Sequence, residues 1–352
     1  MKRKVLFAVS AFLAAVSVLV AVALAQQPAV TYKLIATIPM PGVTAFDISW
    51  TDAASSRFYL AARGPAQGSG SIQVIDTQAL KLLTPITGFV GTVAPPPACA
   101  HSGPNGVVLI PQMNQLYVGD GDSTVKVVDL AKQAIVATIN TGGKCRADEI
   151  GYDPLDHIIM IANPGDSPSF VSFISADTQT IVGQYTYSGA QTGGLEQPVW
   201  SPLAQRFFFT VPATAGVSEG TVDVFNAKTF QREASYPIGL GCSPAGLALT
   251  PDQHLMTSCG VALDTGGGRI AGVGGVSADE IWYNSGDNRY YIGTAVVDAD
   301  SNRVIATLPG AAGTRNGSVD SATNYVFAPY TKVSGSAPFT TVTAGVRVFA
   351  AQ

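Results

Sequence analysis

Two copies of one acidic motif carry the residues of this chain that are best suited to chemistry. Ala-Asp-Glu-Ile occurs at residues 147–150 and again at 278–281, each time at the start of a predicted strand. Five weaker copies align with these two and define two adjacent strand-start positions. The first position holds Phe46, Asn105, Asp148, Glu196, Ala245, Asp279 and Arg315. The second position holds Asp47, Gly106, Glu149, Gln197, Gly246, Glu280 and Asn316.

In six of the seven copies, at least one of these two positions holds a polar or acidic side chain. We call the residues at these two positions the strand-start ring. Carboxylate and amide oxygens suit a hard cation, and a raised-pKa acid beside an ionised one suits acid–base catalysis. The alternative is that these groups only hydrate a channel or cap backbone groups. The expected ligand site comprises His101, Asn105, Arg146, Asp148, Glu149, Glu196, Gln197, Asp279, Glu280 and Asn316. Within it, the expected ligands of Ca²⁺ or another divalent cation are Asp148, Glu149, Glu196, Asp279 and Glu280.

Three basic side chains are expected in or beside this ring. His101 comes just before a first strand, where it would act as a metal ligand or general base, or only bond to loop backbone. Arg146 and Arg315 would clamp an anionic ligand or pair with neighbouring acids, and pairing is the preferred interpretation. Four aromatic residues share a later position of the repeat and are expected to pack between repeats rather than form a ligand cage: Trp50, Tyr152, Trp200 and Tyr283.

The elements that must hold these residues are short β-strands. In the third copy, strands are predicted at 150–152, 158–162, 170–174 and 181–187, with turns rich in Asp, Asn, Pro and Gly between them. The copies recur at a spacing of roughly 35–60 residues, which is the range of propeller blades and other repeat arrays. Four antiparallel strands per copy are typical of a propeller blade.

The two ends of the chain determine the number of blades. The last copy offers strands at 325–328 and 346–349 and then ends one strand short, whereas a spare strand at 33–39 precedes the first copy. An N-terminal strand that completes the last blade would leave no open sheet edge at the seam. We therefore predict an all-β, seven-bladed β-propeller with four-stranded blades, closed by the N-terminal strand, as a single domain over residues 26–352.

Residues 1–25 have a different character from the repeats. Lys2-Arg3-Lys4 precedes an uncharged apolar run at 5–24, and small residues occupy positions 23 and 25. This pattern is typical of a cleaved secretory signal peptide. A retained membrane anchor is the alternative, because the run is close to the ~20 residues that span a bilayer. Once the signal is cleaved, no other stretch is apolar enough to span.

The rest of the composition indicates an acidic protein of the periplasm or the cell exterior. Removal of three basic residues lowers Lys+Arg from 20 to 17 against 24 Asp+Glu, so the formal net charge changes from −4 to −7. Such a chain has no basic patch for phosphates, which excludes nucleic acid as a partner. Four cysteines suit an oxidising compartment. Of the three possible connectivities we predict Cys99–Cys145 and Cys242–Cys259, because the second pair flanks one strand–turn–strand.

Two stretches carry a resemblance to a known family. Val127-Val128-Asp129 followed by Gln133 to Ile139, and Val296-Val297-Asp298 followed by Asn302 to Thr307, resemble the turn between the third and fourth strands of the YVTN/YncE-like propeller repeat proteins. The resemblance extends over essentially the whole mature chain. It implies an exported seven-bladed propeller of the broad amine-dehydrogenase-like class, and it brings no catalytic residues with it.

The sequence leaves three functions open. The preferred one is a module that binds a small ligand or a protein partner at a polar, acidic channel mouth. It is supported by the repeat and by the absence of the motifs HExxH and CxxCH from the sequence. The second is a divalent-metal-dependent hydrolase or lyase similar to lactonase-like propellers, which would use the Asp, Glu and Asn residues of the strand-start ring. The third is a subunit of a periplasmic dehydrogenase whose redox cofactor lies on another chain.

Overall fold

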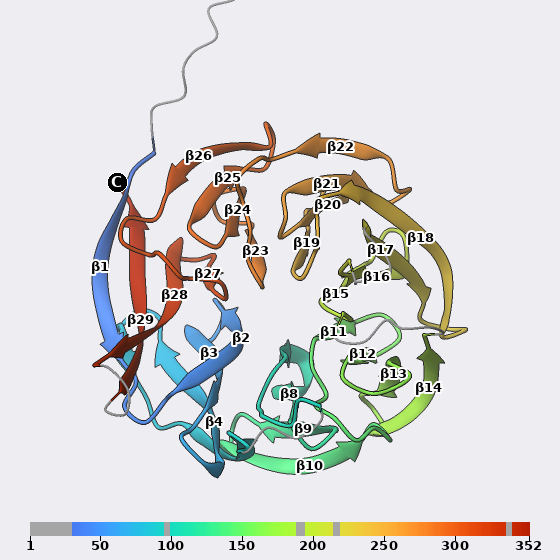
Figure 1. Ribbon diagram of the computed structural model, residues 1–352, viewed down its shortest axis with the longest axis horizontal. Helices are drawn as coiled ribbons and strands as arrows, with labels where there is room; N and C mark the ends of the chain where they lie inside the picture. The colour runs from blue at the N-terminus through green and yellow to red at the C-terminus, as the bar shows by residue number, and fades with distance from the viewer. Residues whose placement is uncertain (1–29, 95–98, 188–193, 214–218, 336–339) are drawn as a thin grey trace, which may run out of the picture.

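Seven β-sheets surround a central channel in the computed structural model of this chain (Figure 1). The structure describes residues 30–352 except 95–98, 188–193, 214–218 and 336–339, so the predicted signal peptide at 1–25 lies outside it. Within each sheet, neighbouring strands run antiparallel. The prediction of an all-β, seven-bladed propeller is confirmed.

Strands at the same place in each blade share one role. The innermost strands, which surround the channel, are β2 (Ala45–Asp52), β7 (Val107–Ile110), β11 (Ile150–Asp153), β15 (Pro198–Ser201), β19 (Leu247–Leu249), β23 (Ile281–Asn284) and β27 (Ser318–Asp320). The second strands are β3 (Arg57–Arg63), β8 (Gln115–Gly119), β12 (Ile158–Asn163), β16 (Arg206–Val211), β20 (His254–Thr257), β24 (Arg289–Ile292) and β28 (Tyr325–Ser334). The third strands are β4 (Gln67–Asp76), β9 (Thr124–Asp129), β13 (Phe170–Ser175), β17 (Glu219–Asn226), β21 (Val261–Asp264), β25 (Ala295–Asp298) and β29 (Thr341–Ala351).

The outermost strands complete the blades. They are β10 (Ala134–Asn140), β14 (Thr180–Thr186), β18 (Gln231–Leu240), β22 (Arg269–Gly272), β26 (Arg303–Thr307) and β1 (Tyr32–Pro39). In the first blade this place is shared by β5 (Lys81–Leu82) and β6 (Ile86–Gly91), both of which pair with β4. Within the described ranges, helical structure is limited to the 3₁₀ turn η1 (Pro111–Met113), so no helix there is long and apolar enough to cross a membrane.

The sequence pattern of each strand follows from its place in the blade. Every residue of β12 is buried, because the adjacent blades cover both faces of its sheet, and the strand is accordingly apolar up to its last residue, Asn163. The outer strand β14 alternates between exposed and half-buried residues, as expected where one face meets solvent. The core lies between blades. Tyr117 and Val127 of one blade, for example, share a cluster with Ile150 and Ile161 of the next.

The blade that closes the ring combines β1, the first described strand, with β29, the last. β1 pairs with β29, with Thr37 opposite Arg347 and Ile38 opposite Val346, and the two strands lie side by side in Figure 1. The hydroxyls of Tyr32 and Tyr291 are hydrogen-bonded at 2.8 Å, which ties β1 to the neighbouring blade. The predicted closing strand is therefore confirmed.

The aspartate of the repeated Val-Val-Asp motif organises a turn. Asp129 Oδ1 accepts hydrogen bonds from the backbone N–H groups of Ala131 and Lys132 at 2.9 and 3.0 Å. Asp298 Oδ1 accepts one from Ser301 at 2.8 Å in the same way. A side-chain oxygen that satisfies these donors replaces the backbone partner that a tight turn lacks. The motif is therefore a structural signature of the turn.

Both predicted disulfides are present. Cys99–Cys145, with Cα atoms 5.7 Å apart, joins the loops that precede β7 and β11 in neighbouring blades. Cys242–Cys259, with Cα atoms 5.5 Å apart, closes a loop around β19 and β20. None of the described cysteines is free. The two disulfides are consistent with an extracellular or periplasmic protein.

Candidate functional site

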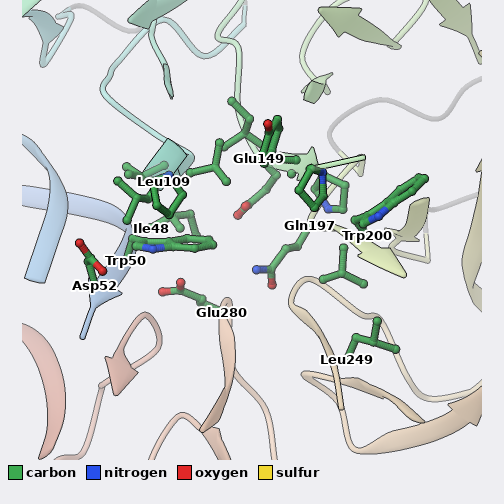
Figure 2. A pocket seen from close by; sticks show the side chains of 18 of the residues that line it. Ile48, Trp50, Asp52, Leu109, Glu149, Gln197, Trp200, Leu249 and Glu280 are labelled. Atoms are coloured by element: carbon green, nitrogen blue, oxygen red, sulfur yellow. The ribbon is translucent and has the colours of Figure 1, made fainter. Parts of the chain in front are cut away.

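A cavity of about 600 Å³ lies in the central channel. Its wall is mainly apolar and includes Ile48, Leu109 and Leu249 together with the indoles of Trp50 and Trp200 (Figure 2). One end is lined by turn residues that are exposed to solvent, among them Pro111, Pro154 and Pro202. The other end is lined by the buried residues Glu149 and Glu280. The cavity therefore opens at the turn end and is deepest at the two glutamates.

Two glutamates from opposite parts of the ring meet the deep end. Glu149 precedes β11 and is 6% exposed, whereas Glu280 precedes β23 and is 2% exposed. Figure 2 shows both carboxyl groups and the amide of Gln197 pointing toward the middle of the channel. Glu280 Oε2 accepts hydrogen bonds from the backbone N–H and the hydroxyl of Ser49, at 3.2 and 3.1 Å. The carboxyl group of Glu149 has no hydrogen bond or ion pair with any residue that the structure describes.

Burial makes these carboxyl groups hard to ionise. Burial is the main cause that raises the pKa of Glu149, and the charges of Asp148, Glu196, Asp47 and Glu280 raise that pKa further. Burial likewise raises the pKa of Glu280 well above its usual range, although the two hydrogen bonds from Ser49 oppose the change. A low-dielectric site disfavours a charged group that has no partner. The deep end of the cavity therefore presents protonated acids, or ionised acids in need of a counter-charge.

A network of two arginines organises the channel mouth beyond the cavity. Arg146 Nη2 lies 2.6 Å from Asp148 Oδ2, and its Nη1 lies 3.8 Å from Asp47 Oδ2. Arg63, at the end of β3, lies 2.8 Å from the same Asp47 oxygen and also donates to Asn105 Oδ1. Asn105 in turn donates to the backbone oxygen of residue 147 at 3.0 Å. The preferred interpretation of Arg146, pairing with neighbouring acids, therefore agrees with the structure.

The remaining members of the predicted site differ in burial. Asp279 and Arg315 form an exposed pair, with Oδ1 and Nη2 3.5 Å apart. Glu196 is half-buried, and burial followed by the charges of Asp148 and Asp279 raises its pKa well above the usual range. Gln197 Oε1 accepts a hydrogen bond from the N–H of Leu247 at 2.8 Å. Asn316 is buried at 3% exposure.

The two aligned positions of the repeat thus differ in role, apart from Asp47, which belongs to the second position and forms an ion pair at the mouth. Three residues of the second position line the cavity: Glu149, Gln197 and Glu280. Three residues of the first position hold ion pairs at the mouth: Asp148, Asp279 and Arg315.

Glycine at the second position follows from how closely neighbouring inner strands approach. Gly106 N donates to Asp148 O of the next blade at 3.2 Å. A Cβ at Gly106 would lie 2.2 Å from that same oxygen, and one at Gly246 would lie 2.7 Å from Asp279 O. Side chains are therefore excluded where one blade's backbone presses on the next.

His101 lies away from the glutamates and beside a disulfide. Its Nε2 is 3.4 Å from Cys99 Sγ. Among the described residues, Cys99, His101 and Cys145 are the one group of three potential ligands whose donor atoms lie within 4.8 Å of one another. The two sulfurs are bonded to each other, so no thiolate remains for a metal.

The carboxyl groups of the ring do not fit a divalent ion as they stand. In the described part of the chain, no three of them bring oxygens within 4.8 Å of one another. Three of the acids near the mouth already have arginine partners: Asp47, Asp148 and Asp279. Ca²⁺ takes six to eight oxygen ligands at about 2.3–2.6 Å, so side chains would have to move to bind it. The divalent cation stays a prediction.

The expectation for the repeated aromatic position needs a correction. Trp50, Tyr152 and Trp200 line the cavity as well as packing between blades. The Trp50 ring also meets Trp282 edge-on, with centroids 5.4 Å apart. Inner strands are short and both of their ends reach the channel, so a side chain of this size contacts the blade core and the cavity together.

Sequence reasoning missed two residues of the site, Arg63 and Ser49. Arg63 follows the apolar run of β3, where a terminal charge also suits a solvent-exposed strand end. Ser49 follows an irregularity in the pairing of β2 with β3, between Phe46 and Ser49, that shifts the register of the first blade. A one-residue shift changes which side chains face the channel, so the alignment of the copies gave no signal for Ser49.

Comparison of the sequence with protein-family models and with curated proteins finds no match. The fold is similar to a solved chain of Kuenenia stuttgartiensis hydrazine synthase, with a TM-score of 0.65 at 14% identity, over 86% of this chain and 95% of that one. It is also similar to a chain of a mitotic checkpoint complex, with a TM-score of 0.66 at 11% identity, over 99% of this chain and 98% of that one. At such identities the likeness shows the propeller fold alone.

Proposed function

We propose that this protein is a binding module that holds a small organic ligand in its central cavity. The observation that carries the proposal is a largely apolar cavity of about 600 Å³ that ends on Glu149, a buried carboxyl group without a described partner. Small-molecule sites are typically apolar clefts of roughly 300–1,000 Å³ with a few convergent polar groups. A buried polar group without a partner is costly, and a ligand that supplies the partner recovers that cost.

A thermal-shift screen of small organic compounds tests this proposal. Compounds that bind the native state raise the melting temperature by mass action. Leu249→Phe adds bulk to the cavity wall and should abolish these shifts. Val304→Phe, at an outer-strand residue that is 43% exposed, should keep them. If no compound stabilises the protein, or if Leu249→Phe retains every shift, the cavity is not the binding site.

A divalent-metal-dependent hydrolase or lyase is the second candidate, and it rests on the carboxyl groups whose charges act on one another around the channel. Calcium chloride tests it. A metal site on the glutamates predicts that Ca²⁺ raises the melting temperature of the wild type but not that of the Glu149→Gln/Glu280→Gln variant. The small-ligand proposal expects no rise in either protein, because the carboxyl oxygens do not converge.

We also propose that the protein is exported and belongs to the YVTN/YncE-like propellers. The signal pattern at 1–25, the two disulfides and the Val-Val-Asp turns support this proposal. Expression of the full chain in a bacterial host, followed by fractionation and N-terminal sequencing, tests the export. A mature protein that begins near residue 26 and leaves the cytoplasm is expected, whereas a cytoplasmic protein that keeps residues 1–25 contradicts it.

A further inference from the structure

We infer that the ligand of the channel is a small organic ammonium ion with an apolar or aromatic body. This inference rests on the proposed function and names the chemical class that its cavity selects.

The charges around the channel do not balance. Each of three arginines is paired with an aspartate: Arg63 with Asp47, Arg146 with Asp148, and Arg315 with Asp279. Three glutamates form no close ion pair with any described residue: Glu149, Glu196 and Glu280. Two of these, Glu149 and Glu280, line the deep end of the cavity. The site therefore lacks positive charge at the place where a ligand would arrive.

An ammonium group supplies the positive charge that the deep end of the cavity lacks. It carries one positive charge and several N–H donors, and Glu149 offers oxygens without described partners. Ionised carboxylates and ammonium groups form the stronger class of hydrogen bond, particularly away from water. Glu280 keeps the two donors from Ser49 and places a second carboxyl group on the opposite side of the channel.

The apolar wall of the cavity favours a ligand whose body is apolar or aromatic. Ile48, Leu109 and Leu249 provide apolar surface between the glutamates and the open end. Trp50 and Trp200 add indole faces, which attract organic cations and stack on flat rings. An inorganic cation would leave this apolar wall unused, and an anion would oppose the ionisation of the same carboxyl groups.

Binding of an ammonium ion should be coupled to a proton. In the free protein, burial keeps a proton on Glu149 above the pH at which an ordinary glutamate loses it. The groups that act on this carboxyl are Asp47, Asp148, Glu196 and Glu280, which oppose its ionisation, and Arg146, which favours it. A bound cation favours the ionised form and releases the proton. Affinity should therefore rise as pH rises, until the amine itself loses its charge.

Isothermal titration calorimetry with three matched probes tests the inference: 2-phenylethylammonium, the neutral 2-phenylethanol and the anion 3-phenylpropanoate. At pH 7 the ammonium ion should bind at least tenfold more tightly than the alcohol, the gain expected of one charged hydrogen bond. Titrations in two buffers of different ionisation enthalpy should show proton release with the ammonium ion only. The anion should not bind.

Two isosteric substitutions locate the charge that is responsible. Glu149→Gln should weaken the ammonium ion about tenfold and leave the alcohol within about twofold. Glu233→Gln removes a charge from an exposed pair with Arg206 and should change neither affinity. If the alcohol binds as tightly as the ammonium ion, the inference fails while small-ligand binding stands. If none of the probes binds, the inference also fails, and the compound screen on Leu249→Phe judges the proposed function separately.

Discussion

Two adjacent acidic residues of the repeat have different roles in the channel. Asp148 and Glu149 are adjacent in the chain and both are buried, at 2% and 6% exposure. Asp148 has the guanidinium of Arg146 beside it at 2.6 Å, whereas Glu149 has no described partner. Successive side chains of an extended segment point in opposite directions, so only Glu149 reaches the cavity. The first carboxyl group contributes to structure and the second is available for binding.

The raised pKa of Glu149 predicts a stability that depends on pH. Because its folded pKa lies above its unfolded value of 4.5, the native state holds a proton that the unfolded state has lost. This contribution to stability is complete below the unfolded pKa and is lost as pH rises through the folded pKa. Glu149→Gln cannot ionise. It should therefore be more stable than the wild type at pH 8, by about 1–3 kcal/mol, and the difference should vanish near pH 4.

Urea denaturation of the wild type and Glu149→Gln between pH 4 and pH 8 measures this difference. Glu233→Gln is the control, because its charge is exposed. A Glu149→Gln protein that is less stable at pH 8 than at pH 4, relative to the wild type, would show that the carboxylate has a stabilising partner.

Individual strands and turns are stabilised by local interactions that recur in several blades. Asp129 and Asp298 satisfy turn donors, and Gly106 and Gly246 allow inner strands to approach. The fifth blade has an additional device. Its strands β19 and β20 have three and four residues, and the Cys242–Cys259 disulfide closes the loop around them. Short strands make few ladder hydrogen bonds, so a cross-link matters most here.

Removal of this cross-link should lower the free energy of unfolding. The Cys242→Ala/Cys259→Ala variant loses a loop closure over 17 residues. The chain-entropy model assigns on the order of 3 kcal/mol to a loop of this length. Guanidinium denaturation of the mature protein, with and without the substitution, measures the loss. Equal midpoints for both proteins would mean that the blade does not depend on its disulfide.

The whole ring is closed by the pairing of its first and last described strands. β1 supplies the outer strand of the blade whose other strands are β27 to β29. Gln352 N donates to the backbone oxygen of residue 31 at 2.9 Å. Ile38 of β1 is 5% exposed within a cluster that also contains Phe58 and Val346, so the closing strand joins the core between the last and first blades. β1 therefore closes the ring and completes the core at the same time, so its removal would remove both contributions to stability.

Deletion of Tyr32 to Pro39 from the mature chain should destabilise the entire protein. The last blade loses its outer strand, and β29 becomes an exposed sheet edge. We expect the melting temperature to fall by about 10 °C or more, since each 1 kcal/mol shifts a protein of this size by a few degrees. Ile35→Thr, at a β1 residue that is 37% exposed, is the control and should melt close to the wild type. A deleted chain that melts with the wild type would show that β1 does not close the ring.

The sequence by itself determined the features that depend on short stretches of chain. Apolar runs bounded by turn residues located most strands, including Val261–Asp264 and Ala295–Asp298 in the two compressed blades. The spare N-terminal strand determined the closure, because a blade with three strands needs a fourth. The spacing of Cys242 and Cys259 around one strand–turn–strand determined their pairing. These features follow from patterns of hydrophobicity and turn chemistry, which a chain carries locally.

Only the tertiary structure decided what the strand-start ring does. The chain does not show that Arg63 reaches Asp47 and Asn105, or that Ser49 binds Glu280, which is 231 residues away. It also does not show that the second position faces a cavity that opens at the opposite end of the channel. These relations depend on how seven separate segments converge on one axis and on a register shift in β2. Charge balance around that axis is a property of the closed ring, and it leaves Glu149 buried without a described partner.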